Sequence, residues 1–219
     1  MIIDIKQLTK TFIDGNKKLN VLKDINLQIE EGSIVTIKGP SGSGKSTLLS
    51  IIGTLDSADS GEFSINGKKI QDELNIDKLR NKSIGFVFQF HNLIAELTLE
   101  ENVSLPKMIA KEKIDKNQIN KLFDYFDLKD RMKSFPNDLS GGEKQRVAVM
   151  RAIINNPSVI IADEPTGNLD KENVLKMISL FQKLNTEKKL TIIIATHDKN
   201  VFDIGHKKYQ LVDGSLEIN

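Results

Sequence analysis

The chain has 219 residues, 39% hydrophobic and 28% charged, and its 31 basic and 30 acidic residues nearly cancel. This size and composition predict one large globular domain, or one domain with a small subdomain. The lack of cysteine excludes disulfides, thiolate zinc sites and a thiol nucleophile. The balanced charge argues against broad nucleic-acid binding. No apolar run reaches the roughly 18 residues of a membrane span.

The first third of the chain predicts short strands and turns. Ile25, Leu27 and Ile29 alternate with polar residues, which is the period of a strand with one buried face. Asn66-Gly67 is typical of a tight turn after a strand. Further short strands are expected at 34–37, 63–65 and 83–88.

The middle of the chain predicts helices. Thr98 and Glu101 have the spacing of a capping box. Asp115 is a candidate cap for a helix whose apolar stripe is expected to pack inward. That stripe consists of Ile119, Leu122, Phe123 and Phe126.

The last third alternates strands and helices, which favours a parallel α/β core. Strands are expected at 159–162 and 190–195, and Asp213-Gly214 indicates a terminal hairpin turn. Val174, Met177, Ile178 and Phe181 mark a helix between the two strands.

A phosphate-binding loop is predicted at GPSGSGKST, residues 39 to 47, which fits G-x-x-x-x-G-K-[ST] between a short strand and a helix. Glycines let the loop turn its N–H groups toward phosphate oxygens, and the helix N-terminus adds positive charge. Lys45 would bridge the β- and γ-phosphates, and the Ser46 hydroxyl would ligate Mg²⁺.

Two acidic residues, Asp163 and Glu164, end the apolar strand that follows Ser158. A carboxylate at such a strand end can hold the magnesium shell beside a phosphate loop, which suits Asp163. Glu164 could polarise a water molecule for attack on the γ-phosphate. A solvated acidic turn before Pro165 is the alternative interpretation.

A second helix N-terminus suited to an anion is predicted at LSGGE, residues 139 to 143. Ser140 and Glu143 form a capping box, and Gly141-Gly142 exposes the first N–H groups of the helix. The alternative is an N-cap and nothing more. A dimer in which each chain completes the other's site would need this second anion site.

Taken together, these segments resemble the ATP-binding cassette (ABC) ATPases over essentially the whole chain. The resemblance implies an α/β fold: a P-loop NTPase core with a mixed sheet, flanking helices and an N-terminal antiparallel β part, plus an inserted α-helical subdomain. Residues 1–89 and 156–219 would form the core, and residues 90–155 the helical subdomain carrying the signature LSGGE.

The resemblance also implies roles for further residues. Gln89 matches the glutamine that touches the metal and the water, and His197 the histidine that contacts the γ-phosphate. Phe12 takes the place of the aromatic residue that stacks on adenine; tyrosine is more usual there, so the stacking face remains and the hydroxyl is lost. His91 and His206 are expected to be structural.

The implied site combines ATP, Mg²⁺ and a second copy of the chain, with the ATP held between the loop of one copy and the signature of the other. The catalytic residues are Glu164, His197 and Gln89, and the magnesium ligands are Ser46, Gln89 and Asp163. The residues that bind ATP within the chain are Phe12, Gly39, Pro40, Ser41, Gly42, Ser43, Gly44, Lys45, Ser46 and Thr47. The residues that bind ATP across the dimer are Leu139, Ser140, Gly141, Gly142 and Glu143, and the segment crossing to the partner is Asn168, Leu169 and Asp170.

A single cassette is typical of the nucleotide-binding subunit of a transporter with separate transmembrane subunits, peripheral on the cytoplasmic face of the inner membrane. Residues 85 to 106 resemble the group of lipoprotein-releasing, macrolide-exporting and cell-division ATPases, and most closely the lipoprotein-releasing type, although Ala95 stands where proline is common. A macrolide or peptide exporter and a non-transport signalling complex stay open as alternatives.

The segment after Gln89 also carries an apolar cluster that is a candidate contact for the membrane partner. Its members are Phe90, Leu93, Ile94 and Leu97. They either pack inside the helical subdomain or form a groove for a cytoplasmic helix of the transmembrane subunit.

Overall fold

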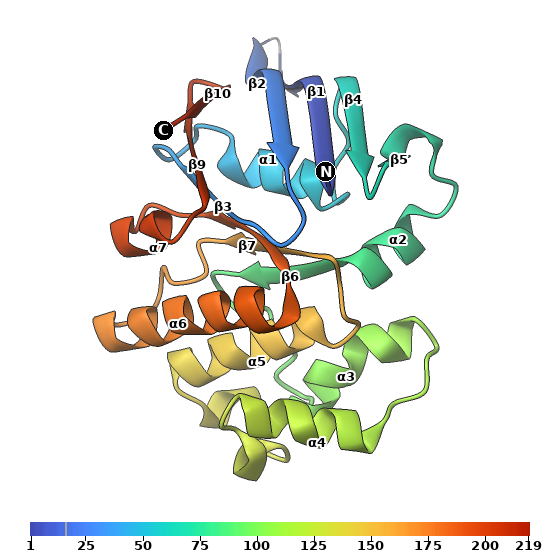
Figure 1. The fold of residues 1–219 in the computed structure, drawn as a ribbon, viewed down its shortest axis with the longest axis vertical. Coiled ribbons are helices and arrows are strands. Elements are labelled where there is room, and N and C mark those ends of the chain that lie inside the picture. Colours follow the sequence, from blue (N-terminus) through green and yellow to red (C-terminus); the bar gives the residue numbers. More distant parts are fainter. Residues whose placement is uncertain (16) are drawn as a thin grey trace.

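The protein was analysed as a computed structural model, which describes residues 1–15 and 17–219. Two sheets and a layer of helices make up the fold (Figure 1). The smaller sheet is antiparallel, in the order β2-β1-β4-β5. Its strands are β1 (Ile3–Asp14), β2 (Lys17–Ile29), β4 (Ser60–Ile65) and β5 (Lys68–Lys69).

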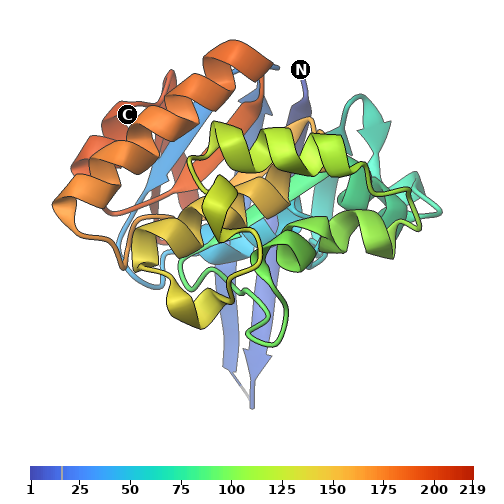
Figure 2. The same ribbon diagram turned by 90° about the horizontal axis from the view of Figure 1, so that it is seen from below.

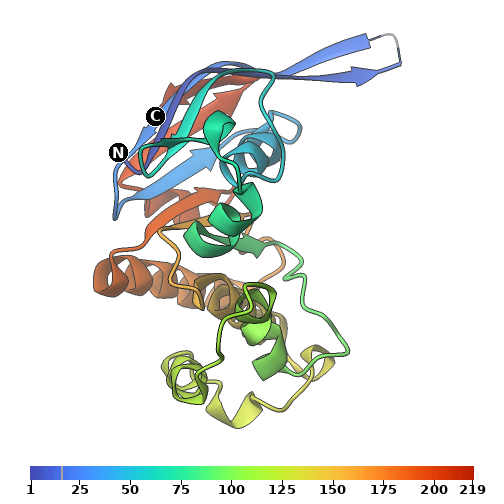
Figure 3. The same cartoon turned by 90° about the vertical axis from the view of Figure 1, so that its right-hand side faces the viewer.

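The pattern predicted for the smaller sheet is confirmed. Ile25, Leu27 and Ile29 are buried while the residues between them are exposed. Asn66 and Gly67 have positive φ angles of 52° and 73°, as a two-residue hairpin turn between β4 and β5 requires. The paired ends of β1 and β2 extend beyond the rest of the fold (Figure 3).

The larger sheet is mixed, in the order β10-β9-β3-β8-β7-β6. All neighbouring strands are parallel except β9 and β10, which form the predicted terminal hairpin around Asp213-Gly214. The strands are β3 (Ile34–Lys38), β6 (Ile84–Phe88), β7 (Val159–Asp163), β8 (Thr191–Ala195), β9 (Lys207–Val212) and β10 (Ser215–Ile218). Asp163 lies in register with Phe88 and Ala195, so these three strands end at one edge.

The α-helices are α1 (Lys45–Ile52), α2 (Ile76–Ser83), α3 (Leu99–Ile109), α4 (Lys116–Tyr125), α5 (Gly141–Ile153), α6 (Lys171–Lys188) and α7 (Lys199–Asp203). Short 3₁₀ turns occupy Ile70–Asp72, Lys129–Arg131 and Pro136–Asp138. Both predicted capping boxes are present, and Asp115 caps α4. None of these helices, within the residues that the structure describes, is both long and apolar enough to cross a membrane.

Two apolar clusters form the core, one on each face of the larger sheet. Ile193 and Ala195 of β8 pack with α1 and the smaller sheet, whereas Ile192 and Ile194 pack with the helices. Figure 2 shows α3 to α6 covering that second face. Phe123 of α4 belongs to this cluster, as its predicted stripe requires. The α/β fold with a mixed sheet is as predicted; the subdomain boundaries at 90 and 155 stay a prediction.

Candidate functional site

The loop of residues 39–44 joins the end of β3 to α1, and close backbone contacts shape it. A Cβ on Gly39 would lie 2.2 Å from the carbonyl oxygen of Leu211, so only glycine fits there. Gly44 has φ 102° and its Cβ would lie 2.8 Å from the Val21 carbonyl oxygen. Gly44 caps α1 without a side-chain hydrogen bond. The first N–H groups of α1 therefore stay available to an anion.

Two polar side chains of the loop differ in their hydrogen bonding. The ammonium of Lys45 donates to the carbonyl oxygens of Gly39 and Pro40 at 2.8 and 3.0 Å. The Ser43 hydroxyl oxygen is buried and has no hydrogen-bond partner within residues 1–15 and 17–219. A buried, unpartnered hydroxyl is costly, and it lies against Gly39, where a Cβ would come within 2.8 Å of this oxygen.

Asp163 ends β7 beside the loop, in a half-buried position whose desolvation raises the pKa of its carboxyl. Neighbouring Glu164 raises this pKa further by charge repulsion. A hydrogen bond from the Ser46 hydroxyl and the charge of Lys45 act in the opposite direction. Such a partly desolvated carboxylate beside a hydroxyl suits a bound cation, whose charge would favour the ionised form.

Glu164 is held next to His197 across two strand ends. Its backbone N–H donates to the Ala195 carbonyl oxygen at 2.9 Å, and its φ of 46° is left-handed. Its carboxylate oxygen Oε2 lies 2.9 Å from Nδ1 of His197. The sequence identified both residues, but their pairing follows from the parallel register of β7 and β8.

Gln89 lies just past the end of β6 and faces the segment after β7. Its Nε2 lies 3.4 Å from Oδ1 of Asn168, whose Nδ2 donates to the Gln89 carbonyl oxygen at 3.3 Å. A Cβ on Gly167 would lie 2.7 Å from Gln89 Nε2, so a larger residue there would displace the Gln89 side chain. Leu169 packs against the core, and Asp170 caps α6.

These elements surround one open cavity of about 550 Å³. Its lining combines most residues predicted to bind ATP within the chain with the acidic, glutamine and histidine residues. The lining residues are Phe12, Val21, Gly39, Ser41, Gly42, Gly44, Lys45, Ser46, Thr47, Gln89, Asp163, Glu164 and His197. Pro40 and Ser43 belong to the loop but not to the lining. Val21 belongs to no motif, and strand pairing rather than any sequence signal places it there.

Phe12 presents an aromatic face at the edge of this cavity, with 42% of its surface exposed. The ammonium of Lys10 lies 5.1 Å from its ring centroid. Lys10 is itself buried, and it donates to Asp56 at 2.8 Å and to the Ser57 carbonyl oxygen at 2.7 Å. The ring is thus in cation–π contact with a fixed lysine while its remaining surface faces the cavity.

The signature residues 139–143 do not line this cavity. Ser140 accepts from the Glu143 N–H at 3.3 Å, and Glu143 accepts from the Ser140 N–H at 2.9 Å. A Cβ on Gly142 would lie 2.3 Å from Oδ1 of Asn173, so α5 begins close against α6. The structure therefore groups the phosphate loop, acidic pair, Gln89 and His197, and leaves the signature apart from them.

The oxygen donors beside the loop fit magnesium. Ser46, Gln89 and Asp163 offer a hydroxyl, an amide and a carboxylate, which are hard ligands. Within residues 1–15 and 17–219, no group of three or more His, Cys, Asp or Glu side chains could hold a metal. Mg²⁺ commonly takes further ligands from substrate phosphates.

Comparisons with known proteins agree with this geometry. The family described as "ABC transporter" matches residues 22–167. The lipoprotein-releasing system ATP-binding protein LolD of Bacteroides fragilis is 45% identical, over 98% of this chain and 100% of that protein. The macrolide export ATP-binding/permease protein MacB of Bdellovibrio bacteriovorus is 41% identical, over 99% of this chain but 33% of that protein.

Among solved structures, a dimeric ATP-binding cassette in a post-hydrolysis state, bound to ADP and Pi, superposes with a TM-score of 0.90 at 41% identity. The match covers 98% of this chain and 96% of that one. The similarity thus extends over the sheets, the cavity and the helical layer together. The chain belongs to the ABC transporter family, as one of its ATP-binding, ATP-hydrolysing subunits.

Proposed function

We propose that the chain is the magnesium-dependent ATPase subunit of a lipoprotein-releasing type of transporter and that it works as a head-to-tail dimer. The similarity to LolD supports the transporter type. One observation carries the dimer: the cavity contains the phosphate loop and acidic pair but none of the signature residues 139–143. One chain thus supplies two halves of different sites, and two antiparallel copies would supply two whole sites. The dimeric form of the similar cassette supports this.

In this proposal ATP lies between the two copies, and the chain's own residues do most of the chemistry. Phe12 stacks on adenine, and the loop N–H groups with Lys45 hold the phosphates. Glu164 takes a proton from a water molecule while the oxygen of that water bonds to the γ-phosphorus. The bond from the γ-phosphorus to the β-γ bridging oxygen breaks at the same time, and ADP leaves. His197 orients Glu164. Mg²⁺, held by Ser46, Gln89 and Asp163, would neutralise charge on the phosphates.

The partner's signature would complete the site from the opposite side. The N–H groups of Gly141 and Gly142 begin α5, and the Ser140 hydroxyl lies beside them. A helix N-terminus with small residues can approach the γ-phosphate closely and favours its charge. We propose that residues 168–170 then cross to the partner and that residues 90–155 move as a helical subdomain.

The test compares the wild type with Glu164→Gln, which keeps the shape of the side chain but cannot accept the proton. We expect ATP hydrolysis to fall by about 10²- to 10⁴-fold and a dimer to accumulate with Mg·ATP in size-exclusion chromatography. Ser140→Arg in the same background should remove the dimer while leaving ATP binding to the monomer. Undiminished hydrolysis, or a dimer insensitive to Ser140→Arg, would contradict the proposal.

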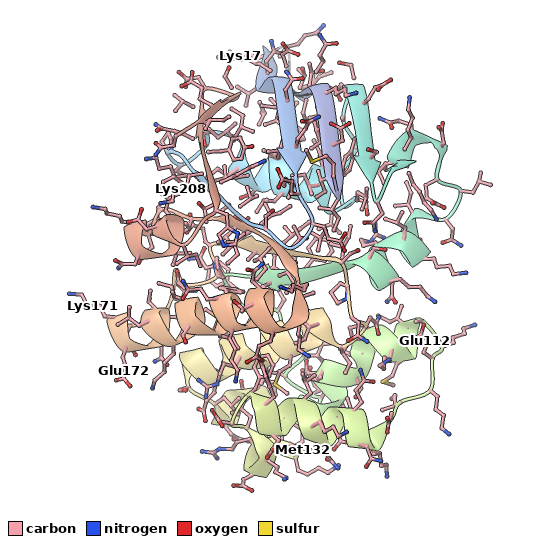
Figure 4. The ribbon with its side chains drawn as sticks, in the orientation of Figure 1. Lys17, Glu112, Met132, Lys171, Glu172 and Lys208 are labelled. Carbon is pink, nitrogen blue, oxygen red and sulfur yellow. The ribbon has the colours of Figure 1, made fainter. Side chains whose placement is uncertain are left out.

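A groove between β6, α2 and α3 supports the proposal that a membrane partner binds. Its volume is about 590 Å³, and its walls are mainly apolar. The apolar lining includes Leu55, Phe86, Phe88, Leu105, Pro106 and Ile109. Beside it, Glu112 (labelled in Figure 4) pairs with Lys82 of α2 at 3.2 Å.

The cluster predicted from the sequence divides into two parts. Leu93 packs against the core, whereas Phe90 is 73% exposed and Ile94 is 42% exposed. Arg151 of the groove wall hydrogen-bonds the backbone of residues 91 and 92, so the exposed part adjoins the groove. We propose that a cytoplasmic helix of the transmembrane subunit occupies this groove, which places the chain at the cytoplasmic face of the inner membrane.

The similarity to the macrolide export protein favours one second candidate, an exporter of that type. Co-purification of the tagged chain from membranes and identification of the bound transmembrane subunit distinguishes the two. Recovery of a permease whose loss blocks lipoprotein release supports the first proposal. Recovery of one whose loss affects drug export alone supports the second.

A further inference from the structure

Two side chains of α5 hold the backbone on both sides of Gln89. Arg151 donates from Nη1 to the Asn92 carbonyl oxygen at 2.5 Å and from Nη2 to the His91 carbonyl oxygen at 2.7 Å. Nearer the start of the helix, Gln145 donates from Nε2 to the Phe88 carbonyl oxygen at 3.3 Å. Gln89 is therefore anchored from before and after by the same helix.

The segment that Arg151 holds has an unfavourable backbone. His91 and Asn92 are both left-handed, with φ angles of 63° and 50°. Residues with a Cβ adopt this region rarely, and two in succession are held only where surrounding contacts compensate. The forked guanidinium bonds both carbonyl groups of the pair at once, which a single-pronged donor cannot do.

The surroundings of the Arg151 charge are also unusual. Within residues 1–15 and 17–219 no carboxylate forms an ion pair with it, and burial lowers the pKa of its guanidinium. Burying a guanidinium without a carboxylate costs free energy, and the hydrogen bonds to the His91 and Asn92 carbonyl groups compensate for this cost. The same guanidinium lines the groove.

We propose that Arg151 is a positioning residue for hydrolysis, which holds the Gln89 amide in place through the carbonyl groups of His91 and Asn92. It thereby joins the groove to the ATP cavity, because one side chain touches the wall of the first and the backbone beside the second. This inference rests on the proposed role of Gln89 in the ATP site.

The test is a double-mutant cycle on the isolated subunit, with ATPase kcat and the half-saturating Mg²⁺ concentration as readouts. Arg151→Met should lower kcat about tenfold and raise the Mg²⁺ requirement, while Arg151→Lys should recover part of both. In a Gln89→Ala background, Arg151→Met should change kcat by less than about twofold, because its effect passes through Gln89.

Arg80 provides the matched control. It lines the same groove, but it pairs with Asp77 and donates to the Thr54 carbonyl oxygen at 2.6 Å, away from Gln89. Arg80→Met should leave basal kcat and the Mg²⁺ requirement within about twofold of the wild type. Thermal unfolding identifies variants that fail to fold, and Arg151→Lys then replaces Arg151→Met in the cycle.

The outcomes separate the inference from the function on which it rests. If Arg151→Met reduces kcat by the same factor with and without Gln89, or leaves kcat unchanged in the wild type, the inference is wrong and the proposed function stands. If Gln89→Ala alone hydrolyses ATP normally, the assigned role of Gln89 fails and the inference fails with it.

Discussion

Nδ1 of His197 and the backbone N–H of His197 both face one oxygen of Glu164, at 2.9 and 3.2 Å. In the tautomer with a proton on Nδ1, His197 places two donors on one oxygen and leaves the other carboxylate oxygen as the acceptor. That oxygen can be directed at a water molecule without the side chain rotating away. The pair therefore orients the base before substrate arrives.

The pairing predicts that His197 controls turnover rather than nucleotide affinity. His197→Ala should lower kcat by about 10²-fold, since the base loses one of its two fixed donors, while the Kd for ATP changes little. Steady-state hydrolysis and fluorescent-nucleotide binding measure the two effects. A change confined to binding would contradict this role, and His206→Ala, which does not line the cavity, is the control.

We expect the Asp163 carboxylate to lower the stability of the folded protein although hydrolysis requires it. Because burial raises the pKa of its carboxyl above 3.8, the folded state favours the protonated form. The ionised side chain therefore destabilises the nucleotide-free protein increasingly as pH rises through the interval from 3.8 to the raised folded value, and fully above it. Asp163→Asn should raise the melting temperature at pH 7.5 and abolish Mg²⁺-dependent hydrolysis.

The melting-temperature gain of Asp163→Asn should shrink as the pH falls through the raised folded pKa and vanish below 3.8, where the wild-type carboxyl becomes protonated in both states. Melting curves recorded at several pH values, without nucleotide, check the sign. A gain that is constant across pH would mean that charge burial is not its cause.

The two capping boxes provide a matched pair of variants. Thr98 with Glu101 and Ser140 with Glu143 have nearly the same geometry, with side-chain oxygens 2.7 Å apart in both. Removing either cap with alanine should cost about 0.5–2 kcal/mol of stability. Only Ser140→Ala should also weaken the ATP-dependent dimer, because only that helix end is proposed to face the partner's nucleotide.

Chemical denaturation measures the first effect, and light scattering with Glu164→Gln and Mg·ATP measures the second. Equal loss of the dimer in Thr98→Ala and Ser140→Ala would show that stability alone is responsible. Rescue of the dimer by Ser140→Thr would strengthen the assignment.

The groove predicts a substitution that separates partner binding from basal activity. Ile109 is 72% exposed and lines the groove, whereas Leu74 is fully exposed and does not. Ile109→Glu should greatly reduce co-purification of the transmembrane subunit, because a charge would have to be desolvated against the docked helix. Leu74→Glu should not, and both variants should keep basal hydrolysis. Retained co-purification in Ile109→Glu would place the contact elsewhere.

Much of the site could be predicted from local sequence, because its parts lie in short motifs at strand ends and helix starts. The loop around Lys45 and the cap at Ser140 need no long-range information. The contact between Glu164 and His197 does, since it depends on the register of β7 against β8. Val21 entered the cavity through strand pairing alone.

The fold was predictable where residues are buried with regular spacing. Helix α2 was not predicted, because none of its residues is buried and Asn75 caps a mostly polar sequence. The groove was predicted only in part. The sequence pointed to residues 90–97, whereas the groove walls include Leu55, Phe86 and Ile109, which are distant from one another along the chain. Apolar cavities between elements depend on packing, which no local pattern records.

The tight fit of Gly39 under Leu211 and of Gly44 under Val21 has a consequence for the limits of a working fragment. The family match covers residues 22–167, so it includes every residue of the phosphate loop and neither of the backbone carbonyl groups that shape it. Val21 comes from the N-terminal hairpin and Leu211 from the C-terminal one. An excised fragment of that span would keep the whole motif but lose the two carbonyl groups that pack against its glycines. Its phosphate loop would then lose its shape although no motif residue had been altered.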